Sequence, residues 1–170
     1  MTEFFHNLLA VMRFRGYLPQ PVTMKGANKW IKQFKPADRK HVSRLLGNVI
    51  YLSESKVKQV LVEQNAALMR RLADAGLPPD KLIYVQVHDA GSSSPVMLNM
   101  LRDAVGLEQR GCRFLVSNNS LGFNKLTNEL GEGALIYVDD FVGSGTQFCK
   151  ARAFAAQNIV GSFSEFLLVP

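Results

Sequence analysis

The sequence predicts an α/β fold in which a parallel sheet follows a helical N-terminal region. The chain has 170 residues, of which 47% are apolar and 20% charged, as in a folded domain with a real core. Apolar residues recur every three or four positions in the first half, whereas short apolar runs alternate with helical patterns in the second. We therefore expect a helical, basic lead-in region at residues 1–80 and an α/β core at residues 81–170.

The helices expected in the first half share apolar residues at helical spacing and are separated by glycine or proline. The first three cover residues 3–14, 26–35 and 42–50. A fourth begins after Ser53 or Ser55, either of which can cap it, and ends at Gly76, ahead of Pro78 and Pro79.

Four short apolar runs in the second half predict strands. They cover residues 82–87, 112–116, 134–138 and 163–169, with helices at 96–105 and 147–157 and a polar loop rich in Asn and Gly at 117–133. This alternation is typical of a parallel sheet, whose two faces are normally covered by helices. The sequence leaves open whether the helices of the first half or a partner cover the last strand, or whether the chain is a fragment.

Positive charge is concentrated in the first half of the chain. Residues 1–80 hold 13 basic and 6 acidic side chains, whereas residues 81–170 hold 7 and 8, and the net charge is +6. This excess favours an anionic partner such as nucleic acid, an acidic protein or a nucleotide. A solvated basic helical surface explains it equally well.

Neither a membrane segment nor a disulfide framework is predicted. No apolar stretch approaches the roughly 20 residues that cross a bilayer, and residues 1–6 lack the basic segment and cleavage site of a signal peptide. The two cysteines, Cys112 and Cys149, define no disulfide framework and show no zinc-ligand spacing with histidine. We therefore expect a cytoplasmic protein.

The segment that carries chemistry is residues 135–146, LIYVDDFVGSGT. An apolar strand delivers Asp139 and Asp140 at its carboxyl end, and a Gly/Ser/Thr loop then leads into a helix. Backbone N–H groups at such a helix start suit a phosphate, and two adjacent carboxylates suit neighbouring hydroxyls of a sugar. The expected ligand is therefore a phosphorylated sugar. A Walker A loop is excluded, because no lysine lies between Lys125 and Lys150.

At these residues the sequence resembles the phosphoribosyltransferase superfamily. The resemblance implies that Asp139 and Asp140 are the catalytic acidic pair, which binds the ribose hydroxyls of phosphoribosyl pyrophosphate. The 5-phosphate of that substrate would lie in the loop that follows. That loop comprises Gly143, Ser144, Gly145 and Thr146, with Gln147 directly after them.

The resemblance assigns a second loop to the pyrophosphate group, together with Mg²⁺ between its oxygens. This loop follows the first core strand and comprises Asp89, Ala90, Gly91, Ser92, Ser93 and Ser94. The superfamily places a mobile loop over the active site where residues 117–133 stand here. The implied fold is a parallel sheet of phosphoribosyltransferase type.

The N-terminal half resembles one branch of that superfamily more closely. Its residues WIKQF at 30–34, Asp38-Arg39, Leu45-Leu46 and YLS at 51–53 look like the helical lead-in of the PRTase-CE family of bacterial conflict systems. The resemblance implies a toxin-like effector of antiphage defence. Some such effectors are held in check by a reverse transcriptase and its RNA–DNA product, as in retrons, and a basic N-terminal half would suit that partner.

Two hypotheses of function remain open. In the first, the protein is an enzyme that displaces pyrophosphate at the anomeric carbon of phosphoribosyl pyrophosphate or cleaves a related N-glycosidic bond in a nucleotide. In the second, the site is catalytically degenerate. It then binds a phosphosugar or nucleotide, while the helical half engages a regulating protein or nucleic acid.

Overall fold

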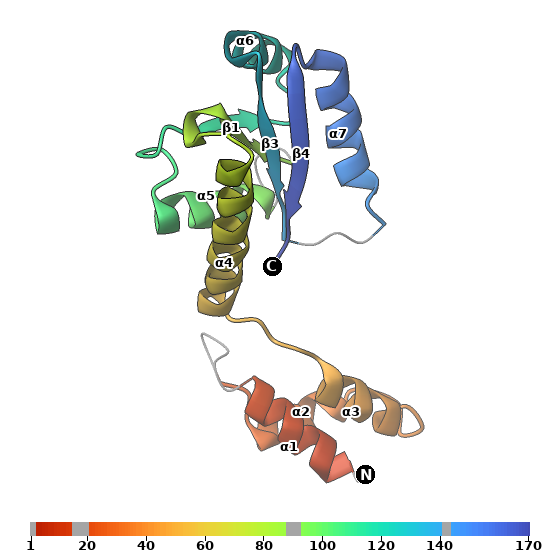
Figure 1. The fold of residues 1–170 in the computed structure, drawn as a ribbon. Coiled ribbons are helices and arrows are strands. Elements are labelled where there is room, and N and C mark those ends of the chain that lie inside the picture. Colours follow the sequence, from red (N-terminus) through yellow and green to blue (C-terminus); the bar gives the residue numbers. More distant parts are fainter. Residues whose placement is uncertain (1–2, 15–20, 88–92, 141–143) are drawn as a thin grey trace. The chain divides into compact units, whose positions relative to one another are not determined.

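A computed structural model describes residues 3–14, 21–87, 93–140 and 144–170 (Figure 1). The chain divides into two compact units, residues 1–54 (unit 1) and residues 55–170 (unit 2). Three helices make up the described part of unit 1: α1 (Glu3–Arg13), α2 (Met24–Ile31) and α3 (Arg39–Asn48).

Polar contacts join the three helices of unit 1. Ser43 Oγ of α3 donates to Asn7 Oδ1 of α1 over 2.7 Å, and Asn7 Nδ2 donates to Asn28 Oδ1 of α2 over 2.8 Å. Gly47 lets α3 approach α1 closely, since a Cβ at this position would lie 3.1 Å from the Cβ of His6. These contacts fix the packing of a unit too small to bury a large apolar core.

Unit 2 is built on a four-stranded parallel sheet. Its strands are β1 (Leu82–Gln86), β2 (Arg113–Val116), β3 (Glu132–Val138) and β4 (Ser162–Leu168), in the order β2-β1-β3-β4. The register pairs Gln86 of β1 with Val138 of β3. β1 and β3 are the central strands, and their apolar runs are buried on both faces of the sheet, as expected for a parallel sheet. The sequence prediction of four strands in an α/β fold is confirmed.

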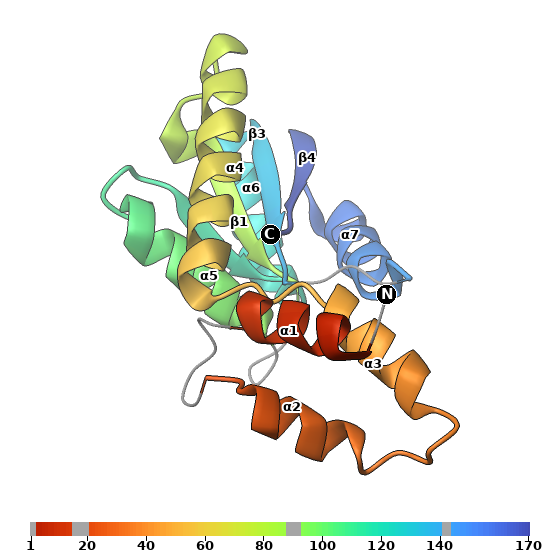
Figure 2. The ribbon, with the colours of Figure 1, turned by 90° about the horizontal axis from the view of Figure 1, so that it is seen from below.

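Helices cover both faces of this sheet (Figure 2). On one face, α4 (Glu54–Asp74) and α5 (Ser94–Val105) pack against the sheet through a core that includes Leu68, Leu101 and Tyr84. On the other face, α6 (Ser120–Leu130) and α7 (Thr146–Asn158) pack through a second core that includes Phe123 and Ala155. A short 3-10 helix, η1 (Pro79–Lys81), leads from α4 into β1.

The polar stretch at residues 117–133, which the sequence analysis interprets as a loop, contains α6, so that interpretation is wrong. Asn119 caps the helix by accepting a hydrogen bond from Gly122 N over 2.9 Å, and Gly131, with a φ of +70°, ends it. Phe123 and Thr127 are buried four residues apart on the inner face of the helix. Its apolar stripe is therefore present in the sequence, but Asn and Gly at the helix ends obscure it.

The long helix α4 belongs to unit 2 by its contacts. Leu61, Leu68 and Leu72 lie in the core beneath the sheet, and Gln64 Nε2 donates to Val169 O over 2.7 Å. The sequence-based division after residue 80 follows charge and periodicity, whereas the compact units divide after residue 54. None of the helices in the described part of the chain is both long and apolar enough to cross a bilayer.

Candidate functional site

The direction in which strands are added to the sheet switches between β1 and β3. From β1 the chain moves outward to β2 on one side, while β3 and β4 extend the sheet on the other side. Ligands of open α/β sheets bind at such a switch in strand order, beyond the carboxyl ends of the strands. The two loops identified in the sequence follow these two strands, so the fold brings them together.

A buried serine at the start of α5 joins the ends of β1 and β3. Ser94 Oγ donates to Val138 O over 2.7 Å and accepts from Val87 N over 3.0 Å. Its hydroxyl therefore fastens the ends of the two strands together, whereas Ser93 beside it is exposed. The remaining predicted members of this loop, Asp89, Ala90, Gly91 and Ser92, lie outside the described residues.

The two adjacent carboxylates at the end of β3 differ in exposure. Asp139 is buried, with 3% of its surface exposed, and its backbone N–H extends the sheet by donating to Leu168 O over 3.1 Å. Its Oδ1 accepts a hydrogen bond from the N–H of the next residue, Asp140, over 3.0 Å, where the backbone bends. Asp140 itself is exposed. Asp139 therefore holds the backbone at the bend, whereas the carboxylate of Asp140 is accessible.

The phosphate loop ends in the first turn of α7. Gly145 precedes the helix with a φ of +75°, and its carbonyl accepts from Cys149 N over 2.8 Å. Ser144 Oγ and Thr146 Oγ1 lie 2.8 Å apart and share a hydrogen bond. The first N–H groups of a helix have no acceptor within the helix, so this end offers backbone donors and two hydroxyls to an anion. Gly143 lies outside the described residues.

An aromatic pair holds the start of α7 against the sheet. The ring of Phe148, in the first turn of α7, meets the ring of Tyr137 of β3 edge to face, with centroids 5.2 Å apart. Tyr137 is buried, and its burial raises the pKa of its hydroxyl, with the nearby Glu165 carboxylate adding to the shift. The phenol of Tyr137 therefore stays neutral. The contact between the two rings fixes the start of α7 against β3, the strand that the acidic pair directly follows.

Beside the phosphate loop lies a polar hollow of about 260 Å³. Gln147 and Lys150 of α7 line it together with Ser117 and Asn118, which follow β2. Ser117 Oγ donates to Val87 O over 2.7 Å, so the end of β2 is fastened to the end of β1. The sequence analysis missed Lys150 and Asn118. The spacing of Gln147 and Lys150, one helical turn apart after the loop, is the signal that could have found Lys150.

Carboxylates, hydroxyls and helix N–H groups therefore follow the carboxyl ends of β1 and β3, and Lys150 lines the neighbouring hollow. Groups of these kinds can bind a phosphorylated sugar. Fold and site define a phosphoribosyltransferase-like α/β protein, with the acidic pair ahead of the phosphate loop.

The PRTase-CE family model matches residues 27–169, from within α2 to the residue that follows β4. The chain therefore belongs to the PRTase-CE family, the phosphoribosyltransferase-like branch of conflict-system effectors. No curated protein matches the chain, and no solved structure matches it.

Proposed function

We propose that the protein binds phosphoribosyl pyrophosphate, or a nucleotide, and transfers or cleaves at the anomeric carbon of its ribose as the effector of an antiphage system. One observation carries the proposal: the Asp139–Asp140 turn and the start of α7 stand at the same switch point between β1 and β3. The ribose hydroxyls would meet the carboxylates, and the 5-phosphate would meet the helix start.

In the proposed reaction the acceptor forms a bond to the anomeric carbon while the bond from that carbon to the leaving group breaks. The leaving group is pyrophosphate in phosphoribosyl pyrophosphate and the base in a nucleotide, and it takes the electron pair of the broken bond. The proton of the acceptor passes to the leaving group or to solvent. The acceptor is water if the reaction is a cleavage, and otherwise a nitrogen or oxygen nucleophile. Asp140 would hold the ribose, and the α7 start would fix the phosphate, so that positioning and electrostatics supply the rate enhancement.

Mg²⁺ would enter with the substrate. This cation usually binds through one or two carboxylates together with substrate phosphates, and the adjacent carboxylates of Asp139 and Asp140 fit that donor set. Over the described ranges of the chain, no three His, Cys, Asp or Glu side chains gather as a metal cage. Bound Mg²⁺ would neutralise charge on the departing pyrophosphate.

Calorimetry with phosphoribosyl pyrophosphate and Mg²⁺, followed by an assay for released pyrophosphate, tests this proposal. We expect saturable binding to the native protein and its loss in the Asp139→Asn, Asp140→Asn double variant. Binding without turnover would favour a catalytically degenerate binding module, the alternative function. Undiminished binding or release in the double variant would overturn the assignment of the acidic pair.

We further propose that unit 1 binds a nucleic acid, such as the RNA–DNA product of a reverse transcriptase. Nine basic and three acidic side chains fall within residues 1–54, whereas residues 55–170 hold eleven of each. Lys25, Lys29 and Lys32 are exposed on one face of α2, opposite the buried Ala27 and Ile31. A row of cations at helical spacing suits a phosphate backbone.

A further inference from the structure

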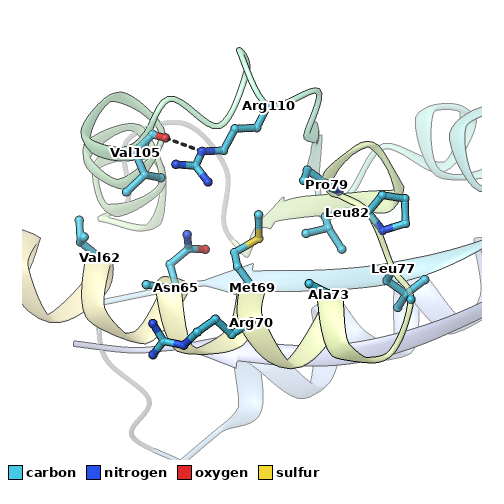
Figure 3. Close-up of a pocket in the computed structure, with 13 residues that line it drawn as sticks. Val62, Asn65, Met69, Arg70, Ala73, Leu77, Pro79, Leu82, Val105 and Arg110 are labelled. Carbon is cyan, nitrogen blue, oxygen red and sulfur yellow. Dashed lines mark hydrogen bonds between the residues drawn. The ribbon is translucent and has the colours of Figure 1, made fainter.

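We propose that unit 2 has a ligand pocket, remote from the candidate site described above, which binds a small anionic molecule with an apolar body. The pocket has a volume of about 820 Å³ and lies between α4 and the segment that follows α5 (Figure 3). Its lining includes Gly76, Pro78 and Pro79, which precede β1. The pocket is thus at the amino end of β1, whereas the candidate site lies beyond the carboxyl end.

Small side chains on α4 create the hollow. Val62, Ala66, Met69 and Ala73 follow one another at intervals of three or four residues, so they share the face of the helix that lines the pocket. Ala66 and Ala73 leave space that larger residues would fill. Val105, at the end of α5, contributes an apolar wall on the other side (Figure 3). This lining suits the apolar body of a ligand.

A buried amide turns a polar group into this apolar pocket. Asn65 is only 4% exposed, and its Oδ1 accepts a hydrogen bond from Tyr84 Oη over 2.5 Å. Burial raises the pKa of Tyr84, so the phenol keeps its proton, and Met69 Sδ lies 3.7 Å from the same hydroxyl. The bond from Tyr84 orients the amide of Asn65 with Nδ2 directed into the pocket (Figure 3). This Nδ2 is a hydrogen-bond donor that a ligand in the pocket can use.

Arginines supply positive charge to the same pocket. Arg110 Nε donates to Val105 O over 3.0 Å, which holds the guanidinium over the pocket and leaves its terminal nitrogens for a ligand (Figure 3). Arg70 also lines the pocket, but its guanidinium is directed away from Arg110 (Figure 3), and no aspartate or glutamate lines the pocket among the described residues. The Arg110 guanidinium and an amide donor without a neighbouring carboxylate select an anion, such as a carboxylate or sulfonate.

The probe for this pocket is anilinonaphthalene sulfonate, which joins a flat apolar body to one anionic group. We expect it to bind the full chain saturably, with one site per molecule, as seen by its fluorescence. In protein labelled with carbon-13 at the methionine methyl groups, the Met69 signal should shift, whereas Met12 and Met24 of unit 1 should not. A saturable site with an unmoved Met69 signal would overturn the proposal, as would binding that does not saturate.

Variants separate the two features of the pocket. Ala66→Leu places a larger side chain in the pocket from an exposed position, and Arg110→Gln removes the positive charge of Arg110. Each change should lower the affinity for the probe about tenfold or more. Arg113→Gln, which changes an exposed arginine outside the pocket, is the matched control and should leave affinity unchanged. The uncharged analogue phenylnaphthylamine should lose affinity with Ala66→Leu but keep it with Arg110→Gln. Equal loss of both probes with Arg110→Gln would contradict a site for anions.

Asn65→Asp tests the buried amide. The aspartate keeps an acceptor for Tyr84 Oη but replaces the donor with a carboxylate that repels an anion, so the sulfonate should bind more weakly than the uncharged analogue. Thermal unfolding identifies any variant that fails to fold. If Asn65→Asp does not fold, the change in probe affinity caused by Ala66→Leu, at an exposed position, decides whether the probe binds in this pocket. Displacement of the probe by phosphoribosyl pyrophosphate would mean that both ligands bind at one site, and it would overturn the claim that this pocket is separate.

Discussion

At the scale of single residues, Asp139 and Asp140 share a charge but not an environment. Asp139 is buried and accepts a hydrogen bond from Asp140 N at the bend after β3, whereas Asp140 is exposed. Asp139→Ala should therefore lower the free energy of unfolding by about 1–2 kcal/mol, because a buried acceptor is lost. Asp140→Ala should change it by less than about 0.5 kcal/mol. Both variants should bind phosphoribosyl pyrophosphate more weakly than the native protein does.

Urea unfolding followed by circular dichroism measures the two stabilities, and calorimetry measures the two affinities. Asp139→Asn is the control, since its amide oxygen can still accept from Asp140 N and should recover most of the stability lost in Asp139→Ala. Equal destabilisation by Asp139→Ala and Asp140→Ala would show that the turn does not depend on the buried carboxylate.

The two cysteines also differ in environment. Cys112 is buried, which raises the pKa of its thiol from 9.0 to about 11, whereas Cys149 is exposed. As pH rises from about 9 to about 11, the unfolded chain releases a proton that folded Cys112 retains, so the free energy of unfolding should fall. Buried Tyr84 and Tyr137, whose pKa values are also raised, add a fall of the same sign at higher pH.

Unfolding measured at successive pH values just above 9 tests this, with Cys112→Ala as the comparison. The variant should show a smaller fall in stability over that range, and parallel curves would contradict the linkage. At neutral to mildly alkaline pH, a thiol reagent should modify Cys149 in the folded protein and reach Cys112 only on unfolding.

At the scale of elements, the start of α7 depends on the left-handed backbone of Gly145. A Cβ there would meet none of the described residues within 4 Å, so among these residues Gly145→Ala adds backbone strain without a steric clash. The strain should lower the free energy of unfolding by about 1 kcal/mol and distort the loop before α7. The affinity for phosphoribosyl pyrophosphate should then fall about tenfold.

Gly76→Ala is the matched control for this prediction. Gly76 has a φ of +80° and equally open surroundings, but it precedes β1 at the other end of the sheet. Both variants should lose similar stability in urea unfolding, and only Gly145→Ala should lose ligand affinity in calorimetry. Equal affinities in the two variants would show that the helix start does not bind the phosphate.

The sequence predicts most of these elements because each strand of the sheet is an apolar run between glycines or polar residues. Residues 134–138, for example, are buried on both faces, so burial and sequence pattern coincide. α6 is obscured because its ends are polar and only Phe123 and Thr127 are buried. The roles of Ser94, Asn65 and Lys150 depend on strand order and on contacts between distant segments, which no local pattern contains.

At the scale of the whole molecule, the two units differ in charge. Unit 2 is electrically balanced and contains the acidic pair, whereas the entire excess of positive charge lies in unit 1. Binding of a nucleic acid should therefore depend on unit 1 and on salt, and binding of a phosphosugar should depend on the described side chains of unit 2.

Replacing Lys25, Lys29 and Lys32 by glutamine tests this division in the full chain. Affinity for a labelled RNA–DNA hybrid, measured by fluorescence anisotropy, should fall linearly with salt on logarithmic axes. The triple variant should reduce the magnitude of that slope by about 2–3, because each lost phosphate contact removes nearly one released counterion. Phosphoribosyl pyrophosphate should bind the variant as it binds the native protein.

The matched control replaces three exposed lysines of unit 2, Lys56, Lys58 and Lys125, by glutamine. It removes the same net charge, so a slope that falls equally in both triple variants would mean that total charge, rather than the face of α2, attracts the hybrid. Trp30, exposed next to Lys29, allows a second distinction. Trp30→Leu should lower the affinity for single-stranded nucleic acid without changing how that affinity depends on salt. The reason is that stacking of a base on an aromatic ring releases no counterions. A slope that changes with Trp30→Leu would instead make the residue part of the electrostatic contact.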